Sequence, residues 1–162
     1  MPLSIRRATT NDIAAILPLW VEFISFHAER DPFFQQDYPS LTHHYQQFVE
    51  KALGSEEWLV VVAEGEKGEL AGFCVATSEN RWPAEYGGHH YGFVEDMAVT
   101  AAHRRQGVAQ ALYGVVEQWF QQQNVDHIEL NVAITNELSR AFWERQGFRN
   151  LTIRMIKRKE KE

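Results

Sequence analysis

The sequence holds little of what disulfides, membrane spans or nucleic-acid binding require. It has one cysteine in 162 residues, so an intramolecular disulfide or a thiolate metal site lacks its second sulfur. No apolar window of about eighteen residues occurs, and residues 1–12 lack the layout of a signal peptide. The net charge of -6 argues against nucleic-acid binding, which needs a basic footprint. We therefore expect a cytoplasmic protein with no nucleic-acid or membrane partner.

The composition is that of a globular protein. Hydrophobic residues make up 44% of the chain and charged residues 23%. A chain of this length normally folds as one compact unit with a buried core. We expect residues 1–162 to form a single domain, with Cys74 as a small core residue in the apolar run 71–77.

Hydrophobic periodicity and turn residues predict an alternation of strands and helices. Strands are expected at residues 3–8, 56–65, 68–78, 91–100, 127–134 and 147–157, and helices at 13–24, 40–53, 108–120 and 136–146. Pro18 is expected to kink or restart the first helix, and residues 79–90 to form a loop. The tight turn at 65–68 indicates an antiparallel hairpin, whereas the later strand-helix-strand order indicates parallel crossovers. The predicted fold class is α/β, with a mixed, mostly antiparallel sheet flanked by helices on both faces.

A short polar segment leads into the third predicted helix. It reads Arg104-Arg105-Gln106-Gly107-Val108-Ala109. A helix N-terminus offers free N–H groups and a positive dipole end to an anion, and glycine lets the backbone approach closely. The Walker and dinucleotide patterns are both absent here, because the segment has one glycine and no Gly-Lys-Ser/Thr tripeptide. The segment predicts a pyrophosphate cradle; the alternative is an ordinary helix start with solvated arginines.

Two groups of residues make the sequence resemble the GNAT superfamily, the N-acetyltransferases that use acetyl-CoA. The first group matches the pyrophosphate loop of that family at Arg104, Gly107 and Ala109. The second matches the family's later pattern in order and spacing, at Asn136, Ser139, Phe142, Trp143, Gly147 and Phe148. The resemblance covers nearly the whole chain and implies the GNAT-like fold.

The resemblance implies a set of positions that contact coenzyme A. The pyrophosphate is expected on the loop before the third helix, and the pantetheine arm beside the strand that precedes it. A backbone N–H of that strand would also stabilise the oxyanion of the reacting thioester. The implied positions are Met97, Ala98, Val99, Arg104, Arg105, Gln106, Gly107, Val108, Ala109, Asn136 and Trp143. Asn136 is read equally well as a plain helix cap.

Glu95 is the catalytic residue that the resemblance implies. An acceptor amine resembling lysine titrates near ~10.4, so a general base must take its proton. Strand alternation places Glu95 and Asp96 on opposite faces unless a bulge intervenes, so only one is expected to face the acceptor. The alternative for either acid is a cap or an ion pair with a neighbouring arginine.

Trp143 departs from the family pattern, which often has tyrosine at this position. An indole does not ionise usefully and cannot protonate the departing thiolate. Water or another group would then supply that proton, or the thiolate would leave unaided, since a thiol titrates near ~8.5. Trp143 is read either as a wall of the pantetheine channel or as a core aromatic.

The acceptor site is expected in two less patterned segments, residues 27–34 and 81–90. Their aromatic and acidic side chains suit a cationic amine. The candidate substrate-binding residues are Glu29, Asp31, Trp82, Glu85 and Tyr86, together with Asp96. We expect no metal, because His27, His89 and His90 lack further ligands at a suitable spacing.

The leading hypothesis is an N-acetyltransferase that uses acetyl-CoA as co-substrate and acetylates a primary amine of a small molecule by direct attack on the thioester. One alternative is a catalytically weak module that senses acyl-CoA, favoured by Trp143. Another is acetylation of a protein N-terminus or lysine, which requires an open peptide groove. The resemblance also leaves a homodimer open, since dimers are common in the family.

Overall fold

The computed structural model describes residues 3–35, 37–81 and 88–159. The chain divides into two compact units, residues 1–131 and 132–162, so the single domain expected from the sequence stays a prediction. No helix in these described ranges is long and apolar enough to cross a membrane.

The first unit is built on a five-stranded sheet in the order β1-β2-β3-β4-β5. Its strands are β1 (Ser4–Arg7), β2 (Trp58–Glu64), β3 (Leu70–Arg81), β4 (His89–Val99) and β5 (His127–Leu130). Neighbours pair antiparallel except β4 and β5, which pair parallel. The mixed, mostly antiparallel sheet predicted from the sequence is confirmed.

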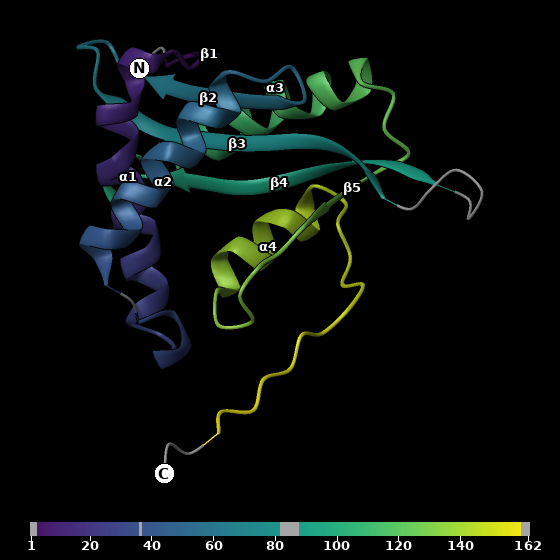
Figure 1. Ribbon diagram of the computed structural model, residues 1–162. Coiled ribbons are helices and arrows are strands. Elements are labelled where there is room, and N and C mark those ends of the chain that lie inside the picture. The colour runs from purple at the N-terminus through teal and green to yellow at the C-terminus, as the bar shows by residue number, and fades with distance from the viewer. Residues whose placement is uncertain (1–2, 36, 82–87, 160–162) are drawn as a thin grey trace. The chain divides into compact units, whose positions relative to one another are not determined.

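Helices cover both faces of this sheet, as predicted. They are α1 (Ile13–Ala28), α2 (Tyr38–Leu53) and α3 (Val108–Gln122). Figure 1 shows α1 and α2 on one face and α3 on the other. Ile16, Val49 and Phe73 are fully buried in the core between the sheet, α1 and α2. On the other face Gly72 approaches Leu112 of α3, and Gly92 approaches Phe120.

Cys74 is a core residue, as expected. Its side chain is fully buried in β3, and this burial raises the pKa of its thiol well above the ordinary value. The thiol is therefore held neutral inside the sheet.

Several element boundaries differ from those predicted. Helix α1 runs unbroken through Pro18, because proline removes one N–H while Ile16 and Leu19 on either side are anchored in the core. The predicted loop at 79–90 is partly strand, since β3 and β4 pair as far out as Arg81 and His89. The hairpin ladder thus extends beyond the apolar residues that signal it.

The predicted last strand, residues 147–157, does not form. Residues 148–159 carry no helix or strand, and Leu151, Ile153 and Met155 are 66%, 79% and 88% exposed. Similarly, the strand expected at 127–134 ends at Leu130. Alternating side chains specify the two faces of a strand but supply no pairing partner, and a strand forms only by pairing.

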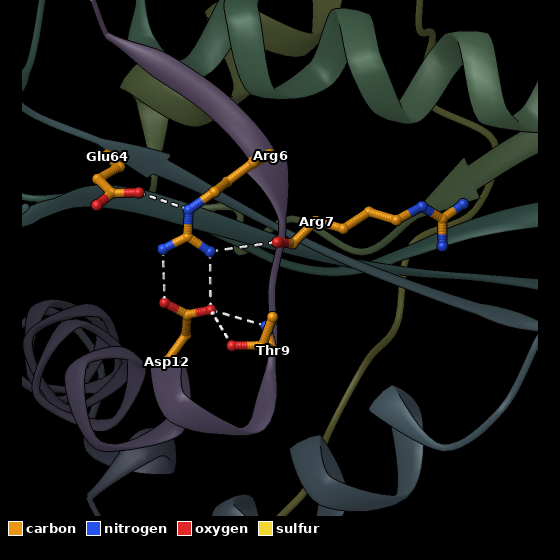
Figure 2. A network of polar contacts seen from close by, with 5 residues as sticks. All are labelled: Arg6, Arg7, Thr9, Asp12 and Glu64. Atoms are coloured by element: carbon orange, nitrogen blue, oxygen red, sulfur yellow. Dashed lines mark hydrogen bonds and ion pairs between the residues drawn. The ribbon is translucent and has the colours of Figure 1, made fainter.

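A polar network ties the first strand to the turn that starts α1, as Figure 2 shows. The guanidinium of Arg6 donates two hydrogen bonds of 2.8 Å to the Asp12 carboxylate and a further bond to Glu64. The backbone N–H and hydroxyl of Thr9 also donate to Asp12, at 2.7 and 3.0 Å. Arg6 thereby holds the pKa of Asp12 far below its usual range.

Replacing Arg6 by methionine should destabilise the protein by about 1–3 kcal/mol, because Asp12, whose side chain is 10% exposed, would lose its charged partner. Arg7→Met is the matched control, since the Arg7 side chain points away from the network (Figure 2), and should change stability by less than about 0.5 kcal/mol. The difference in free energy of unfolding between wild type and Arg6→Met should become smaller below about pH 4. There the wild type loses the stability that ionised Asp12 provides. Urea unfolding at several pH values measures this; equal loss in both variants would contradict it.

Gly92 is required by the close approach of β4 to α3. A Cβ there would lie 2.6 Å from the Phe120 ring, so Gly92→Ala should cost about 1–3 kcal/mol. Gly114, in the middle of α3, has no atom within 4 Å of the corresponding point, and Gly114→Ala should instead stabilise by about 0.5–1 kcal/mol. Thermal unfolding of both variants checks the opposite signs.

Candidate functional site

A β-bulge at Glu95 sets which face of the sheet each acid occupies. Val94 pairs with Ala76 and Asp96 with Val75, so Glu95 is an extra residue with no partner on β3. Directly paired residues share a face, and Gly92 faces Phe120 of α3. The bulge inverts the alternation, so that Asp96 lies on the opposite face, beside core residue Val75 under α1 and α2.

Asp96 is bound from the α2 layer. The hydroxyl of Tyr45 donates a hydrogen bond of 2.8 Å to Asp96 Oδ2. Burial raises the pKa of Asp96, and the bond from Tyr45 opposes that rise. Asp96 is therefore a half-buried acid with a defined internal partner, a tyrosine hydroxyl rather than the cap or arginine that the sequence analysis considered.

Glu95 has the pKa of a general base that works near neutrality. Its surface is exposed, yet its carboxyl stands among enough protein atoms that desolvation is the largest cause of a pKa raised to about 7. Repulsion by Asp96 and then by Glu79 adds to the rise. Glu79, on β3, accepts a hydrogen bond of 2.9 Å from the Tyr91 hydroxyl.

The outer edge of β4 becomes free near Glu95. Strand β5 pairs with β4 over residues 91–94, and within the described part of the chain no strand pairs with that edge over 95–99. The backbone of Met97, Ala98 and Val99 lies in this stretch. Unpaired N–H and C=O groups at a strand edge can bind an extended ligand. Contact of these residues with coenzyme A, which the family resemblance implies, stays a prediction.

The loop before α3 has the backbone of an anion site. Gly107 is the N-cap of α3 at φ 80°, and no side chain caps the helix there. Arg105 also has a left-handed φ of 61°. A Cβ at Gly107 would meet nothing within 4 Å, so the space on that side of the residue is open. The N–H groups of Val108 and Ala109 begin that turn, where anions bind best.

The side chain of Arg104 is engaged with α1 and the end of β4. Its guanidinium is 3.3 Å from Glu22 Oε1 and donates to the Val99 carbonyl, also at 3.3 Å. Glu22 Oε1 accepts the Ala101 N–H as well, at 2.9 Å. The side chain of Gln106 likewise serves the loop, donating to the Ala102 carbonyl at 2.9 Å. Both side chains thus bond to neighbouring parts of the protein, and their contact with coenzyme A stays a prediction.

The second unit contains α4 (Glu137–Arg145). Asn136 is its N-cap, and the side chain accepts a hydrogen bond of 3.1 Å from the Ser139 N–H, as the capping interpretation requires. Trp143 is 6% exposed and packs edge-on against Phe142 and Phe148. Contact of either residue with coenzyme A stays a prediction.

Of the predicted acceptor residues, the structure describes Glu29, Asp31 and Asp96. Glu29 ends α1 with an exposed side chain. Asp31 caps the short 3-10 turn Pro32–Phe34 by accepting the Phe33 N–H at 2.8 Å. Trp82, Glu85 and Tyr86 lie outside the described residues, so their role stays a prediction. Within the described ranges no group of three or more His, Cys, Asp or Glu is placed to hold a metal.

Three residues around the acids and the loop were missed by the sequence analysis: Glu22, Tyr45 and Glu79. Each acts through a partner far along the chain; Tyr45 and Asp96, for example, are 51 residues apart. Only Glu79 could have been found from the sequence, because it directly follows the predicted apolar strand 68–78 and could have been included in that strand.

Comparison with known proteins identifies solved structures of the same architecture. A mutant of the BH1408 protein from Bacillus halodurans has TM-score 0.84 and 22% identity, covering 97% of this chain and 99% of that chain. The aminoglycoside N-acetyltransferase AAC(6')-Iy, in complex with CoA, has TM-score 0.73 and 17% identity over 98% of this chain and 95% of its own. AAC(6')-Ih from Acinetobacter baumannii has TM-score 0.71 and 18% identity, covering 99% of each chain. These likenesses show the fold.

The sequence shows the family through a profile match, although the search of curated proteins found no match. The profile of the Acetyltransferase (GNAT) family matches residues 20–148, which is well over half of the chain and includes β4, the loop and α4. This protein therefore belongs to the GNAT acetyltransferase family.

Proposed function

We propose that this protein transfers the acetyl group of acetyl-CoA to a primary amine of a small molecule, with Glu95 as the general base. The position of Glu95 carries the proposal. It is the bulged residue of β4, it stands where β5 ends its pairing, and its pKa is about 7. A carboxyl group with that pKa is half ionised near neutral pH, as a base for an ammonium acceptor requires.

The proposed step needs no covalent enzyme intermediate. The amine nitrogen attacks the thioester carbonyl carbon, and the Glu95 carboxylate takes the proton that the nitrogen loses. The carbon–sulfur bond breaks, and the electron pair leaves with sulfur as a thiolate. Because a thiol titrates near ~8.5, this group leaves without a protein acid, which removes the need for a tyrosine at Trp143.

The residues present fit coenzyme A as the acetyl carrier. The uncapped first turn of α3 and the open space at Gly107 suit the pyrophosphate. The free edge of β4 over 97–99 suits the amide-containing pantetheine arm and an oxyanion. Two solved structures with this fold are aminoglycoside N-acetyltransferases, one of them in complex with CoA.

The acceptor is proposed to be a small cationic amine. Negative charge is concentrated on β3 and β4 at Glu95, Glu79 and Asp96. Repulsion from Asp96 and from Glu79 raises the pKa of Glu95, which indicates that the three groups are close together. Tyr91 adds an aromatic ring bonded to Glu79, and aromatic and carboxylate groups both attract ammonium. Glu29, Asp31, Trp82, Glu85 and Tyr86 remain the proposed outer contacts.

Substitution of Gly107 tests the pyrophosphate site. Gly107 and Gly68 share a left-handed φ of 80° and 81°, and at neither would an added Cβ have an atom closer than 3.7 Å. Alanine at either position should therefore cost about 1–2 kcal/mol of stability from the backbone alone. Only Gly107→Ala should also weaken coenzyme A binding, by roughly tenfold, because its methyl group enters the space before the helix. Calorimetric titration compares the two variants; equal coenzyme A affinities would place the pyrophosphate elsewhere.

Substitution of Glu95 tests the base. Release of coenzyme A thiol from acetyl-CoA, measured across a panel of small amines, should rise with pH through about 7 in the wild type, because the base must be deprotonated. Glu95→Gln should slow turnover by roughly 10²–10⁴-fold with unchanged acetyl-CoA affinity.

Glu79→Gln is the matched control for this experiment. This variant removes a charge that repels Glu95 but keeps the base itself. The pKa of Glu95 should fall, so the pH profile of turnover should move to lower pH while turnover persists. Unimpaired turnover in Glu95→Gln would exclude Glu95 as the base. Tight acetyl-CoA binding with no turnover on any amine would instead support an acyl-CoA sensor.

A further inference from the structure

Tyr45 reaches the acids of β4 from a rigid position in the core. It lies on α2 and is 7% exposed. Its ring stacks on Trp20 with centroids 4.1 Å apart and planes 9° from parallel, and it meets the edge of Phe73. Ring contacts on two sides fix the direction of the hydroxyl, which ends 2.8 Å from Asp96 Oδ2. The hydrogen bond is therefore a built feature of the fold rather than a surface contact.

The bulge places the receiving carboxylate beside Glu95. Asp96 pairs with Val75, on the face covered by α1 and α2, and Glu95 is the unpaired residue immediately before it. A carboxyl group in such a layer normally takes up a proton, because burial penalises its charge. The hydroxyl of Tyr45 offsets this by donating to the ionised form.

We propose that Tyr45 is a positioning residue for the base: its hydroxyl holds the Asp96 carboxylate, ionised, in the α2 layer with its negative charge beside Glu95. This rests on the proposed role of Glu95. Tyr45 is buried in the core, and it acts through Asp96. The negative charge of Asp96 makes proton uptake by Glu95 more favourable, which keeps Glu95 effective as a base.

The charged and titratable groups around the acids are few in the described ranges. Strand β3 contributes Glu79, which repels Glu95, and Cys74, whose buried thiol is neutral. Helix α2 contributes Tyr45, whose own pKa is raised well above its usual value by burial, so it stays a donor. With the thiol and the phenol uncharged, Asp96 and Glu79 are the charged groups that add to the effect of desolvation in raising the pKa of Glu95.

The test measures the titration of Glu95 directly. Carbon-13 NMR of the side-chain carboxyl groups in the free protein gives the Glu95 pKa, and the pH profile of kcat/KM gives it in turnover. Tyr45→Phe keeps the stacked ring and removes only the hydroxyl. Asp96 should then protonate at a higher pH, and the Glu95 pKa should fall by about 1 pH unit, with the activity profile moving to lower pH by the same amount.

Two further variants separate positioning from packing. Asp96→Asn should lower the Glu95 pKa in the same direction, and the double variant should show no additional fall, because both changes act through one carboxylate. Tyr113→Phe is the matched control. It removes a buried hydroxyl that contacts Glu117 on α3, and it should leave the Glu95 titration unchanged.

The outcomes are distinct from those of the proposed function. An unchanged Glu95 pKa in Tyr45→Phe, or additive shifts in the double variant, would overturn the role of Tyr45. If the NMR shift occurs as expected but Glu95→Gln retains full turnover, Tyr45 still controls the charge beside Glu95, and the assignment of Glu95 as the base is what fails.

Discussion

One extra residue in β4 is the constraint on which the candidate site depends. Before Glu95 the even-numbered residues of β4 face α3, since a Cβ at Gly92 would point at Phe120. After it, the register puts Asp96 and Ala98 on the face of α1 and α2. Without the bulge Asp96 would point into the α3 layer, away from Tyr45. The inversion both releases Glu95 from the ladder and gives its acidic neighbour an internal hydrogen bond.

The same strand connects this acid pair to the loop before α3, the proposed pyrophosphate site. Arg104 and Glu22 join the loop after β4 to α1, so the loop is held by the layer that also holds Asp96. The contact is between exposed groups and contributes little to global stability. Its value lies in local geometry, because the Ala101 N–H and the Arg104 guanidinium share one carboxylate oxygen. Asp96, near the end of β4, and the loop that follows β4 are thus both bonded to the layer of α1 and α2.

The local features of this fold were readable in the sequence, and the long-range ones were not. The period of residues 108–120 predicted α3, and the hairpin turn predicted the antiparallel pairing of β2 and β3. The sequence analysis allowed for a bulge at Glu95 and Asp96 but could not predict it, because a bulge depends on how β4 aligns with β3 rather than on either strand alone. Tyr45 in α2 and Glu22 in α1 looked like ordinary helix residues, since their partners lie 51 and 82 residues away. Apolar and polar residues alternate over 147–157 as they do in a strand, but this alternation does not ensure that a neighbouring strand is available for pairing.

The buried cysteine has a practical consequence for the chemistry of this protein. Cys74 is fully enclosed, and its thiol is held protonated, so a disulfide reagent that reacts with thiolates has no target on the folded chain. Under the proposed function, any thiol signal that grows during an assay with acetyl-CoA then originates from coenzyme A. The same residue becomes reactive only when β3 separates from its neighbours, so slow labelling of a single site per molecule reports the opening of the sheet itself.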